Sequence, residues 1–455
     1  MDVTLDNIAQ FATSTRPGKI PADVLDKADK ILLDSLACAY AGLQSPGAKV
    51  AAAITDIPRG TPGTVIGTHA EATLDMAAFW NTCMIRYADC NDSLTGGHPS
   101  DMFGPLIAVA GAHGLPGRTL LSGIAVAYEV FHLLIFKSRQ YYKHKGALVD
   151  NLSFDQGFYV ATSAAAGIAH MLQYDKAKTA AAVSLAATSG LPLRASRAGE
   201  LSHYKGVATA VSSRAAVFAC QLAESGLTAP SAPFEGRHGF IEIFEGKAGP
   251  MNLGPLGEWY ILRTALKYFP ATANCQVSIW TAREMRALVD VEQVREIVLH
   301  TSRFLWHESG SEPAKWAPTT HETADHSLPY IFTTALVDGN IDLRSYDDDK
   351  LARPHVLALM QKVKVVVDPE IEAAYPAILQ IRAVATLVDG TTREVHCKNP
   401  KGVPLNPMNR DDIKIKFQQL AGPTLGDKTD KFWDLACTLA DSANIKTVFK
   451  QMVVE

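Results

Sequence analysis

Several common signatures are missing from this sequence of 455 residues, and each absence excludes a class of protein. The seven cysteines form no C-x-x-C pair, which disfavours an iron–sulfur cluster and predicts free thiols in a reducing compartment. The net charge is -4 and no Lys/Arg run makes a basic stripe, so nucleic acid is not a predicted partner. The motifs G-x-G-x-x-G, G-x-x-x-x-G-K-[ST] and G-x-S-x-G are absent, so dinucleotide, P-loop and hydrolase functions lack their signatures.

Targeting and membrane signals are missing too. The N-terminus carries Asp2 and Asp6 early and has no apolar segment of signal-peptide length. We find no apolar run that approaches the ~20 residues needed to cross a bilayer. We therefore expect a cytoplasmic protein, or the mature form of a mitochondrial matrix protein, with no membrane partner.

Apolar residues, by contrast, are plentiful. Hydrophobic residues make up 47% of the chain and charged residues 20%, which is typical of a packed globular protein. The length indicates two or three domains, since a domain has about 150 residues.

Helical periodicity dominates the first part of the chain. The segment 21–42 opens with Pro21, repeats apolar residues at helical spacing and ends at Gly42, which predicts a helix. Its second half is rich in small residues that let neighbouring helices approach closely, so we expect it to be central in a bundle. Similar periodic segments are 73–89, 105–114, 120–136, 156–172, 176–189 and 206–225.

Strand patterns appear only after Lys267. Alternating apolar residues predict strands near 294–302 and 362–368, and a hairpin over 378–397 with a turn at Asp389-Gly390. Helical segments at 277–288 and 327–338 accompany them. Helix returns in the segment 400–420, with Asp411 and Asp412 in the first turn, and again over 428–454. We predict a mainly α protein: a helical domain (1–266), an inserted, smaller α+β lid domain (267–398), and C-terminal helices (399–455) that pack back on the first domain.

A dense polar cluster lies between two apolar helices. It runs from Asp89 to Asp101 and contains Asn91, Asp92, Ser93 and His98. Such a cluster could place His98 beside a carboxylate that sets its tautomer and raises its basicity. Two alternatives stay open: a loop whose Asp or Ser side chains cap the next helix, and a divalent metal site, although the spacing matches no zinc or calcium pattern.

Three further clusters contain candidate residues. Arg194, Tyr204 and Lys205 precede a long Ala-rich helix, where cations beside a helix N-terminus would form an anion-binding pocket; the alternative is a solvated loop. Lys267 precedes two aromatic residues where the domains join, so partial burial would shift its pKa, unless it is an ordinary surface lysine. The segment 321–327 is interpreted first as helix caps and second as part of an active site.

Taken together, these motifs resemble the MmgE/PrpD family. The stretch D-C-N-D-S…G-G-H-P-S-D over 89–101 is similar to the family signature D-x-N-D-[ST]…G-H-P-S-D. Further matching features follow in the same order along almost the whole chain: Leu32–Gly42, Lys205-Gly206, Glu235–Phe240, Lys267 before Phe269-Pro270, His326–Tyr330 and Lys401–Met408.

The resemblance implies a helical domain with an α+β lid, a homodimer, and an enzyme that uses neither a metal nor an organic cofactor. Family activities include 2-methylcitrate dehydration, cis-aconitate decarboxylation and iminodisuccinate epimerisation, and all of them make or quench a carbanion next to a carboxylate. We therefore expect a lyase acting on a small di- or tricarboxylate, most similar to 2-methylcitrate dehydratase. The alternatives are an epimerase, a decarboxylase and a non-catalytic carboxylate-binding homologue.

Carried over residue by residue, the resemblance implies catalytic roles for Asp89, Ser93, His98, Lys205 and Lys267. We add Asn91, Asp92, Arg194, Tyr204, Asp155 and Gln156 as candidates for substrate binding. The sequence departs from the family pattern at two places. Asp155 and Gln156 stand nearest to the position of an expected histidine, and 315–317 reads Lys-Trp-Ala where the decarboxylase has a tyrosine. Both departures speak against decarboxylation.

Overall fold

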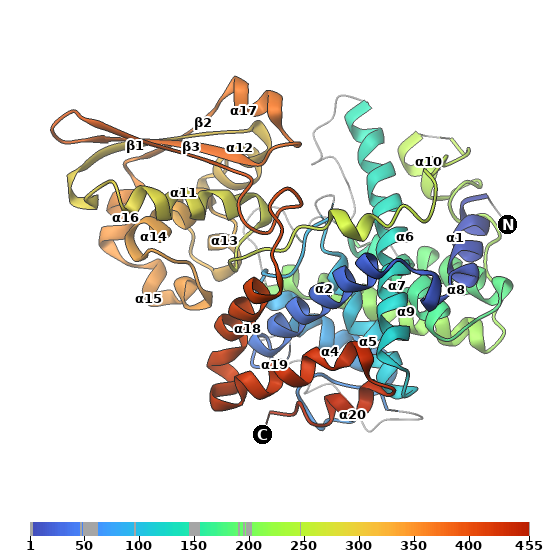
Figure 1. The fold of residues 1–455 in the computed structure, drawn as a ribbon. Coiled ribbons are helices and arrows are strands. Elements are labelled where there is room, and N and C mark those ends of the chain that lie inside the picture. Colours follow the sequence, from blue (N-terminus) through green and yellow to red (C-terminus); the bar gives the residue numbers. More distant parts are fainter. Residues whose placement is uncertain are drawn as a thin grey trace.

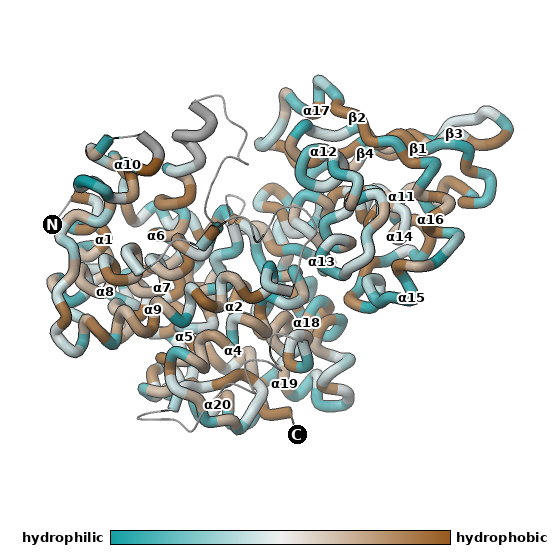
Figure 2. Tube along the Cα trace, turned by 180° about the vertical axis from the view of Figure 1, so that it is seen from behind, coloured by the Kyte–Doolittle hydropathy of each residue, from teal (hydrophilic) through white to brown (hydrophobic). Residues whose placement is uncertain are grey.

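The computed structural model describes residues 3–45, 48, 62–94, 97–144, 155–189, 192–193, 196, 203–245 and 247–454. Within these ranges the chain is mainly helical with one small sheet, which confirms the predicted fold class. Helices gather in one part of the molecule and the sheet lies in the other (Figure 1). Both parts contain apolar stretches, with hydrophilic stretches at the outer turns (Figure 2).

The helical part is a bundle of the apolar segments found in the sequence. Its helices are α1 (Val3–Ser14), α2 (Ala22–Ala41), α4 (Leu74–Tyr87), α5 (Phe103–Ala112), α6 (Gly117–His144), α7 (Gly157–Met171), α8 (Lys176–Thr188), α9 (Ala208–Glu224) and α10 (Phe240–Glu245). Almost every residue of α5 and α7 is buried. Small residues make this possible, because they let helix backbones approach closely.

The lid contains a four-stranded sheet in the order β2-β1-β3-β4. The strands are β1 (Val294–Thr301), β2 (Val363–Val367), β3 (Gln380–Leu387) and β4 (Thr392–Lys398). β1 pairs in parallel with β2 and antiparallel with β3, and β3 and β4 form the predicted hairpin. Burial alternates along the strands, so helices cover one face, as Figure 1 shows for α11 (Gln276–Arg286), α14 (Leu328–Asp338) and α16 (Pro354–Met360).

Shorter helices complete the lid, and three more follow it. Those in the lid are α12 (Arg303–Gly310), α13 (His321–Ala324), α15 (Asp348–Leu351) and α17 (Pro369–Ala374). The C-terminal helices are α18 (Arg410–Leu425), α19 (Thr429–Cys437) and α20 (Ile445–Phe449). The helix expected over 428–454 is thus broken, and Asn444 caps the start of its last piece.

Two separate hydrophobic cores are present. The first draws on residues from Leu5 to Leu266 and again from Met408 to Met452, so α18 packs beside α2 (Figure 1). The second draws on residues from Phe269 to Cys397. We keep the predicted domains 1–266, 267–398 and 399–455 as a proposal that these two cores support.

The chain leaves and re-enters the helical part at adjacent points. The main-chain N–H of Leu266 donates to the carbonyl oxygen of Gly402 at 2.9 Å. Gly402 has a φ of 105°, and a Cβ added there would stand 2.0 Å from the carbonyl oxygen of Leu266. Only glycine fits both requirements, which explains this residue of the Lys401–Met408 motif.

The expectations about disulfide bonds and about apolar runs can be compared with the structure. None of the seven cysteines forms a disulfide, which confirms the predicted free thiols. The expectation about apolar runs was wrong, because Gly117–Ser138 and Tyr204–Glu224 have the length and hydropathy of a membrane span. In the most apolar 18 residues of each segment, 89% of the first stretch and 56% of the second are buried inside the protein. Core packing accounts for the apolar character of the first.

Candidate active site

The carboxylate of Asp89 lies at the centre of the candidate site. Asp89 follows the end of α4 with a φ of 42°, and its side chain is almost fully buried. Arg86, one turn earlier on α4, donates a hydrogen bond to Oδ1. Lys267 Nζ donates to the same oxygen at 2.9 Å and to the carbonyl oxygen of Asp89 at 2.7 Å. Burial would raise the pKa of Asp89, but Arg86, Lys267 and Lys205 together hold it well below its usual range.

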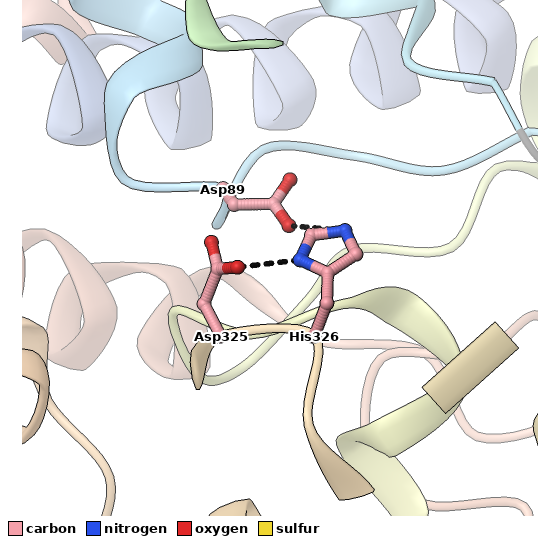
Figure 3. Close-up of side chains that lie close together, drawn as sticks. All are labelled: Asp89, Asp325 and His326. Carbon is pink, nitrogen blue, oxygen red and sulfur yellow. Dashed lines mark hydrogen bonds and ion pairs between the residues drawn. The ribbon is translucent and has the colours of Figure 1, made fainter. Parts of the chain in front are cut away.

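The lid places two more side chains against Asp89. Asp325 and His326 lie between α13 and α14, and the three side chains converge in Figure 3. His326 Nδ1 hydrogen-bonds to Asp325, and its Nε2 stands 3.6 Å from Oδ2 of Asp89. Burial and then Lys205 lower the pKa of His326 to about 4, so this ring is neutral at pH 7.

Lys205 connects the two carboxylates. It belongs to a short 3-10 turn (His203–Gly206) before α9 and is 3% exposed. Its Nζ lies 3.3 Å from Oδ2 of Asp325, 3.8 Å from Oδ2 of Asp89 and 3.2 Å from Nδ1 of His326. Lys205 and Asp325, which are distant in sequence, therefore meet only in the folded chain.

His98 is oriented by the main chain and not by a carboxylate, contrary to the sequence-based expectation. Its Nδ1 lies 2.6 Å from the carbonyl oxygen of Asp92, while its Nε2 lies 3.9 Å from Oδ1 of Asp89. Since a carbonyl only accepts, Nδ1 carries the hydrogen and Nε2 of the neutral ring is free of one. Burial, then Arg86 and Lys267, lower the pKa of His98 well below its ordinary value.

Behind His98 lies a buried polar network. Asp92 accepts hydrogen bonds from Tyr128 at 2.6 Å and from the hydroxyl of Ser100 at 2.5 Å. Asn91 donates to Ser100 at 3.0 Å and to Asp101 at 2.9 Å. Burial raises the pKa of Asp92 to about 7. Ser100 thus hydrogen-bonds to Asp92 instead of capping a helix. The predicted roles of Asn91 and Asp92 in substrate binding stay predictions.

A small pocket, partly open to solvent, reaches Asp89 from outside. Lys205 and Asp325 line it beside Asp89, so both domains contribute to its wall. The other lining residues are Ser45, Cys83, Arg86, Tyr87, Gly206, Val207, His321 and Glu322. His98 and Lys267 touch Asp89 but are not part of this wall.

The remaining predicted residues have varied positions. Ser93 pairs with Ala265 through two main-chain hydrogen bonds of 2.8 and 2.9 Å, which hold Lys267 near Asp89. Gln156 accepts from the main-chain N–H of His98 at 2.7 Å, and the adjacent Asp155 is buried.

Tyr204, in contrast, is 48% exposed. Arg194 lies outside the described residues. The structure therefore brings together Asp89, His98, Lys205 and Lys267, with Gln156 behind them.

Asp325 and His326 lie in the segment 321–327, whose sequence indicates helix caps first and an active site second. Their contacts in the structure favour the second interpretation for these two residues. The caps in this segment are Thr320, which accepts from Thr323 N, and Ser327, which accepts from Tyr330 N. Residues that cap helices and residues that face Asp89 are neighbours in this segment, so the sequence alone indicates caps. The adjacent Asp-His pair was the available signal, since a carboxylate next to a histidine is a common acid–base arrangement.

The site has the composition of an anion site more than of a cation site. One ligand atom each from Asp89, Asp325 and His326 lie within 4.8 Å of one another, a spacing that would suit a metal ion. However, the basic groups of Arg86, Lys205 and Lys267 stand within 4 Å of the two carboxylates. Arg86 also faces Asp101, with Nε 3.8 Å from Oδ2, so three carboxylates match the three cations. Around Asp89 itself the three cations still oppose a divalent ion and favour a carboxylate.

Comparison with known proteins gives the family. The chain matches the MmgE/PrpD N-terminal domain over residues 6–251 and the MmgE/PrpD C-terminal domain over residues 269–440. A cis-aconitate decarboxylase-like protein of Aspergillus oryzae is 24% identical, covering 96% of this chain and 95% of its own length. An alkylcitrate dehydratase of a fungal species is 27% identical, with 86% and 82% covered, and the 2-methylcitrate dehydratase of Cupriavidus necator is 26% identical, with 83% and 81% covered. With both family domains matched in order, as the sequence motifs predicted, the chain belongs to the MmgE/PrpD family.

Proposed function

We propose that this protein is a metal-independent hydro-lyase that removes a proton next to a carboxylate of a small di- or tricarboxylate and releases water. The observation that carries the proposal is the meeting of buried cations and neutral imidazoles at one carboxylate, Asp89. Relatives named as 2-methylcitrate and alkylcitrate dehydratases support the same class of substrate.

The first step is binding of a substrate carboxylate by Lys205, which lines the pocket between Asp89 and Asp325. As the neighbouring C–H loses its proton, negative charge builds on that carboxylate. A buried ammonium group stabilises this charge more in the transition state than in the ground state, and such electrostatic stabilisation is usually the largest contribution to catalysis.

The proton goes to an imidazole. His98 is neutral at pH 7, with Nε2 toward Asp89, so it is the first candidate for the general base. Oδ2 of Asp89 is buried and accepts no hydrogen bond within the described part of the chain. A substrate hydroxyl that donates a hydrogen bond to this oxygen would lie at the site as the leaving group. The imidazole of His98, protonated in the preceding step, would then donate its proton to this hydroxyl, which leaves as water.

A second function is favoured by one observation. His98 and His326 approach different oxygens of Asp89, with Nε2 atoms at 3.9 and 3.6 Å. An epimerase needs two acid–base groups, one for each face of a single stereocentre. The two imidazoles beside Asp89 are the candidates for these two groups, so epimerisation of a dicarboxylate is the second candidate, ahead of decarboxylation.

The test is ultraviolet absorbance at the unsaturated-acid band with 2-methylcitrate, citrate, cis-aconitate and a panel of hydroxy- and amino-dicarboxylates after EDTA treatment. We expect a change that survives the chelator, because the site chemistry needs no metal. His98→Asn should lower kcat by about 10²–10⁴. His170→Asn is the control, since His170 is also buried but bonds to Ala12 and Ser122 away from the site.

Other outcomes select between the alternatives. No absorbance change, but deuterium uptake from D₂O next to a carboxylate, would identify an epimerase. No turnover in either assay, with dicarboxylates still binding in calorimetry, would identify a non-catalytic homologue. Loss of turnover with EDTA that is restored by a divalent metal would contradict metal independence.

Two further properties, the oligomeric state implied by the family and the location expected from the sequence, stay proposals. We propose a homodimer, which light scattering on the purified full chain would test. We also propose a cytoplasmic location, or the mitochondrial matrix in a eukaryote, and seven free cysteines support a reducing compartment.

A further inference from the structure

A lysine of the C-terminal segment reaches the polar loop from behind the pocket. Lys416 on α18 is fully buried, and its Nζ donates one hydrogen bond to Asp34 on α2 and another, at 2.6 Å, to the carbonyl oxygen of Cys90. Burial opposes its charge, but Asp34 raises the pKa of Lys416 above its ordinary value. Lys416 is therefore an ammonium group at neutral pH, next to the residue that follows Asp89.

Two lysines hold successive carbonyl groups of this loop. Lys267 donates to the carbonyl oxygen of Asp89 at 2.7 Å, and Lys416 donates to that of Cys90. Between these two carbonyls the backbone turns, and Asp89 has the left-handed φ of 42°. This conformation is disfavoured for a residue with a Cβ and persists only where surrounding contacts hold it.

Contacts other than Lys416 also hold α18 on α2. The same two helices are joined by a second ion pair, Arg410 to Asp29 at 2.9 Å, and by buried apolar residues such as Ile413 and Phe417. A fully buried ion pair costs desolvation and is often replaceable by apolar side chains without loss of stability. Two features set the Asp34–Lys416 pair apart from the Asp29–Arg410 pair: it is fully buried, whereas the Arg410 side chain is 42% exposed, and it contacts Cys90.

We propose that Lys416 is a positioning residue of the active site: through the carbonyl group of Cys90 it holds Asp89 in the conformation that aims its carboxylate at Lys205 and the two histidines. The mechanistic part of this inference rests on the proposed function, because Asp89 must take part in turnover. Residues more than three hundred positions apart would thereby set one catalytic geometry, and the C-terminal helices would be a functional part of the site.

The experiment compares two double variants of the full chain. Asp34→Leu with Lys416→Met removes both buried charges, so no unpaired charge remains to unfold the protein. Asp29→Leu with Arg410→Met is the control, since it removes the other ion pair between the same two helices. We expect kcat of the first variant to fall on the order of tenfold to a hundredfold with KM little changed, because small misplacements of catalytic groups have effects of this size. The control should keep the wild-type kcat.

Crystal structures of both variants test the inference without any turnover. In the Asp34/Lys416 variant we expect the φ of Asp89 to leave the left-handed region and its contact with Lys267 to lengthen. A loop unchanged from the wild type would overturn the proposal, as would a kcat within twofold of the wild type. If the wild type turns over no acid in the panel, the proposed function fails, and the loop geometry alone decides the role of Lys416.

Discussion

At the scale of the residue, Asp89 depends on partners from four separate segments of the chain. Arg86 precedes it on α4, Lys205 comes from the turn before α9, Lys267 from the join between the domains, and His326 from the lid. All three cations are buried, but Arg86 and Lys205 line the pocket and Lys267 does not. Under the proposed function, this difference separates Lys205, which faces the substrate, from Lys267, which maintains the ionised state of Asp89 from behind.

Replacement of each lysine should therefore give a different kinetic result. Lys205→Met removes a cation that faces the substrate, so we expect KM to rise about tenfold and kcat to fall, because the charge it stabilises grows in the transition state. Lys267→Met leaves the pocket wall intact but frees the carbonyl group and carboxylate of Asp89, so kcat should fall with a smaller change in KM. Steady-state kinetics of both variants test this; equal KM values would contradict the division of roles.

The pH dependence of kcat/KM follows from the state of His98. A general base must be neutral, and this form is lost as the pH falls through the pKa of the free enzyme. Burial, Arg86 and Lys267 lower that pKa, so the acid limb of the profile should lie below about pH 6.5, the ordinary value for histidine. A profile from pH 4.5 to 8 measures the limb, and a midpoint at or above 6.5 would be incompatible with this assignment.

At the scale of the element, the contact between α4 and α5 positions the polar loop that joins them. Thr82 on α4 donates to the carbonyl oxygen of Asp101 at 3.1 Å, and Asp101 in turn accepts from Asn91. Gly104 on α5 allows this approach: an added Cβ would stand 2.0 Å from the hydroxyl oxygen of Thr82 and 2.8 Å from the carbonyl oxygen of Ala78.

Gly104→Ala should therefore force the two helices apart. We expect a loss of about 1–3 kcal/mol in the free energy of unfolding, the usual cost of overpacking. Activity should fall as well, since the loop carries Asp89 and His98. Thermal unfolding followed by circular dichroism measures the stability. Gly18→Ala serves as the control, because a Cβ there meets no atom within 4 Å; equal unfolding temperatures for the two variants would show that the helices adapt.

At the scale of the whole molecule, the charge cluster connects two parts that have separate cores. Asp89 belongs to the helical part, whereas Asp325 and His326 belong to the lid. Each part buries its own apolar surface, so the relative position of the two parts depends on contacts such as these. Protonation of the cluster should therefore affect stability as well as catalysis.

Stability should decrease between pH 6.5 and pH 4. The pKa of His326 is about 4 in the folded protein and about 6.5 when unfolded, so within this range the unfolded state binds more protons. Stability is fully present above 6.5 and falls as the pH drops, by at most on the order of 3 kcal/mol from this residue. The unfolding temperature as a function of pH, for the wild type and His326→Gln, isolates this contribution.

The variant should lose part of the pH dependence and keep the rest. The pKa values of His98, His132 and His170 are also lowered by burial, and these residues titrate equally in both proteins. Asp325, with a pKa of about 2, adds acid sensitivity only below its ordinary value near 3.8. Identical pH curves for the two proteins would show that the folded structure does not lower the pKa of His326.

Local patterns determined much of this fold before any tertiary contact was known. Helical and strand periods depend on neighbours within a few residues, so segments such as 21–42, 176–189 and 378–397 were predicted close to their observed bounds. The polar cluster at 89–101 was recognisable as a site for the same reason, since consecutive residues supply its aspartates and its histidine. The motifs were also sufficient to indicate the family.

Only the tertiary structure decided which of these groups meet. Asp325 and His326 are close to Thr320 and Ser327 in sequence. The sequence alone does not distinguish the residues that cap helices from those that face Asp89, more than two hundred residues away. The tautomer of His98 is set by a main-chain carbonyl, which every residue carries and no side-chain pattern reports. Burial and long-range contact fix the charge state of each group, and neither is a property of local sequence.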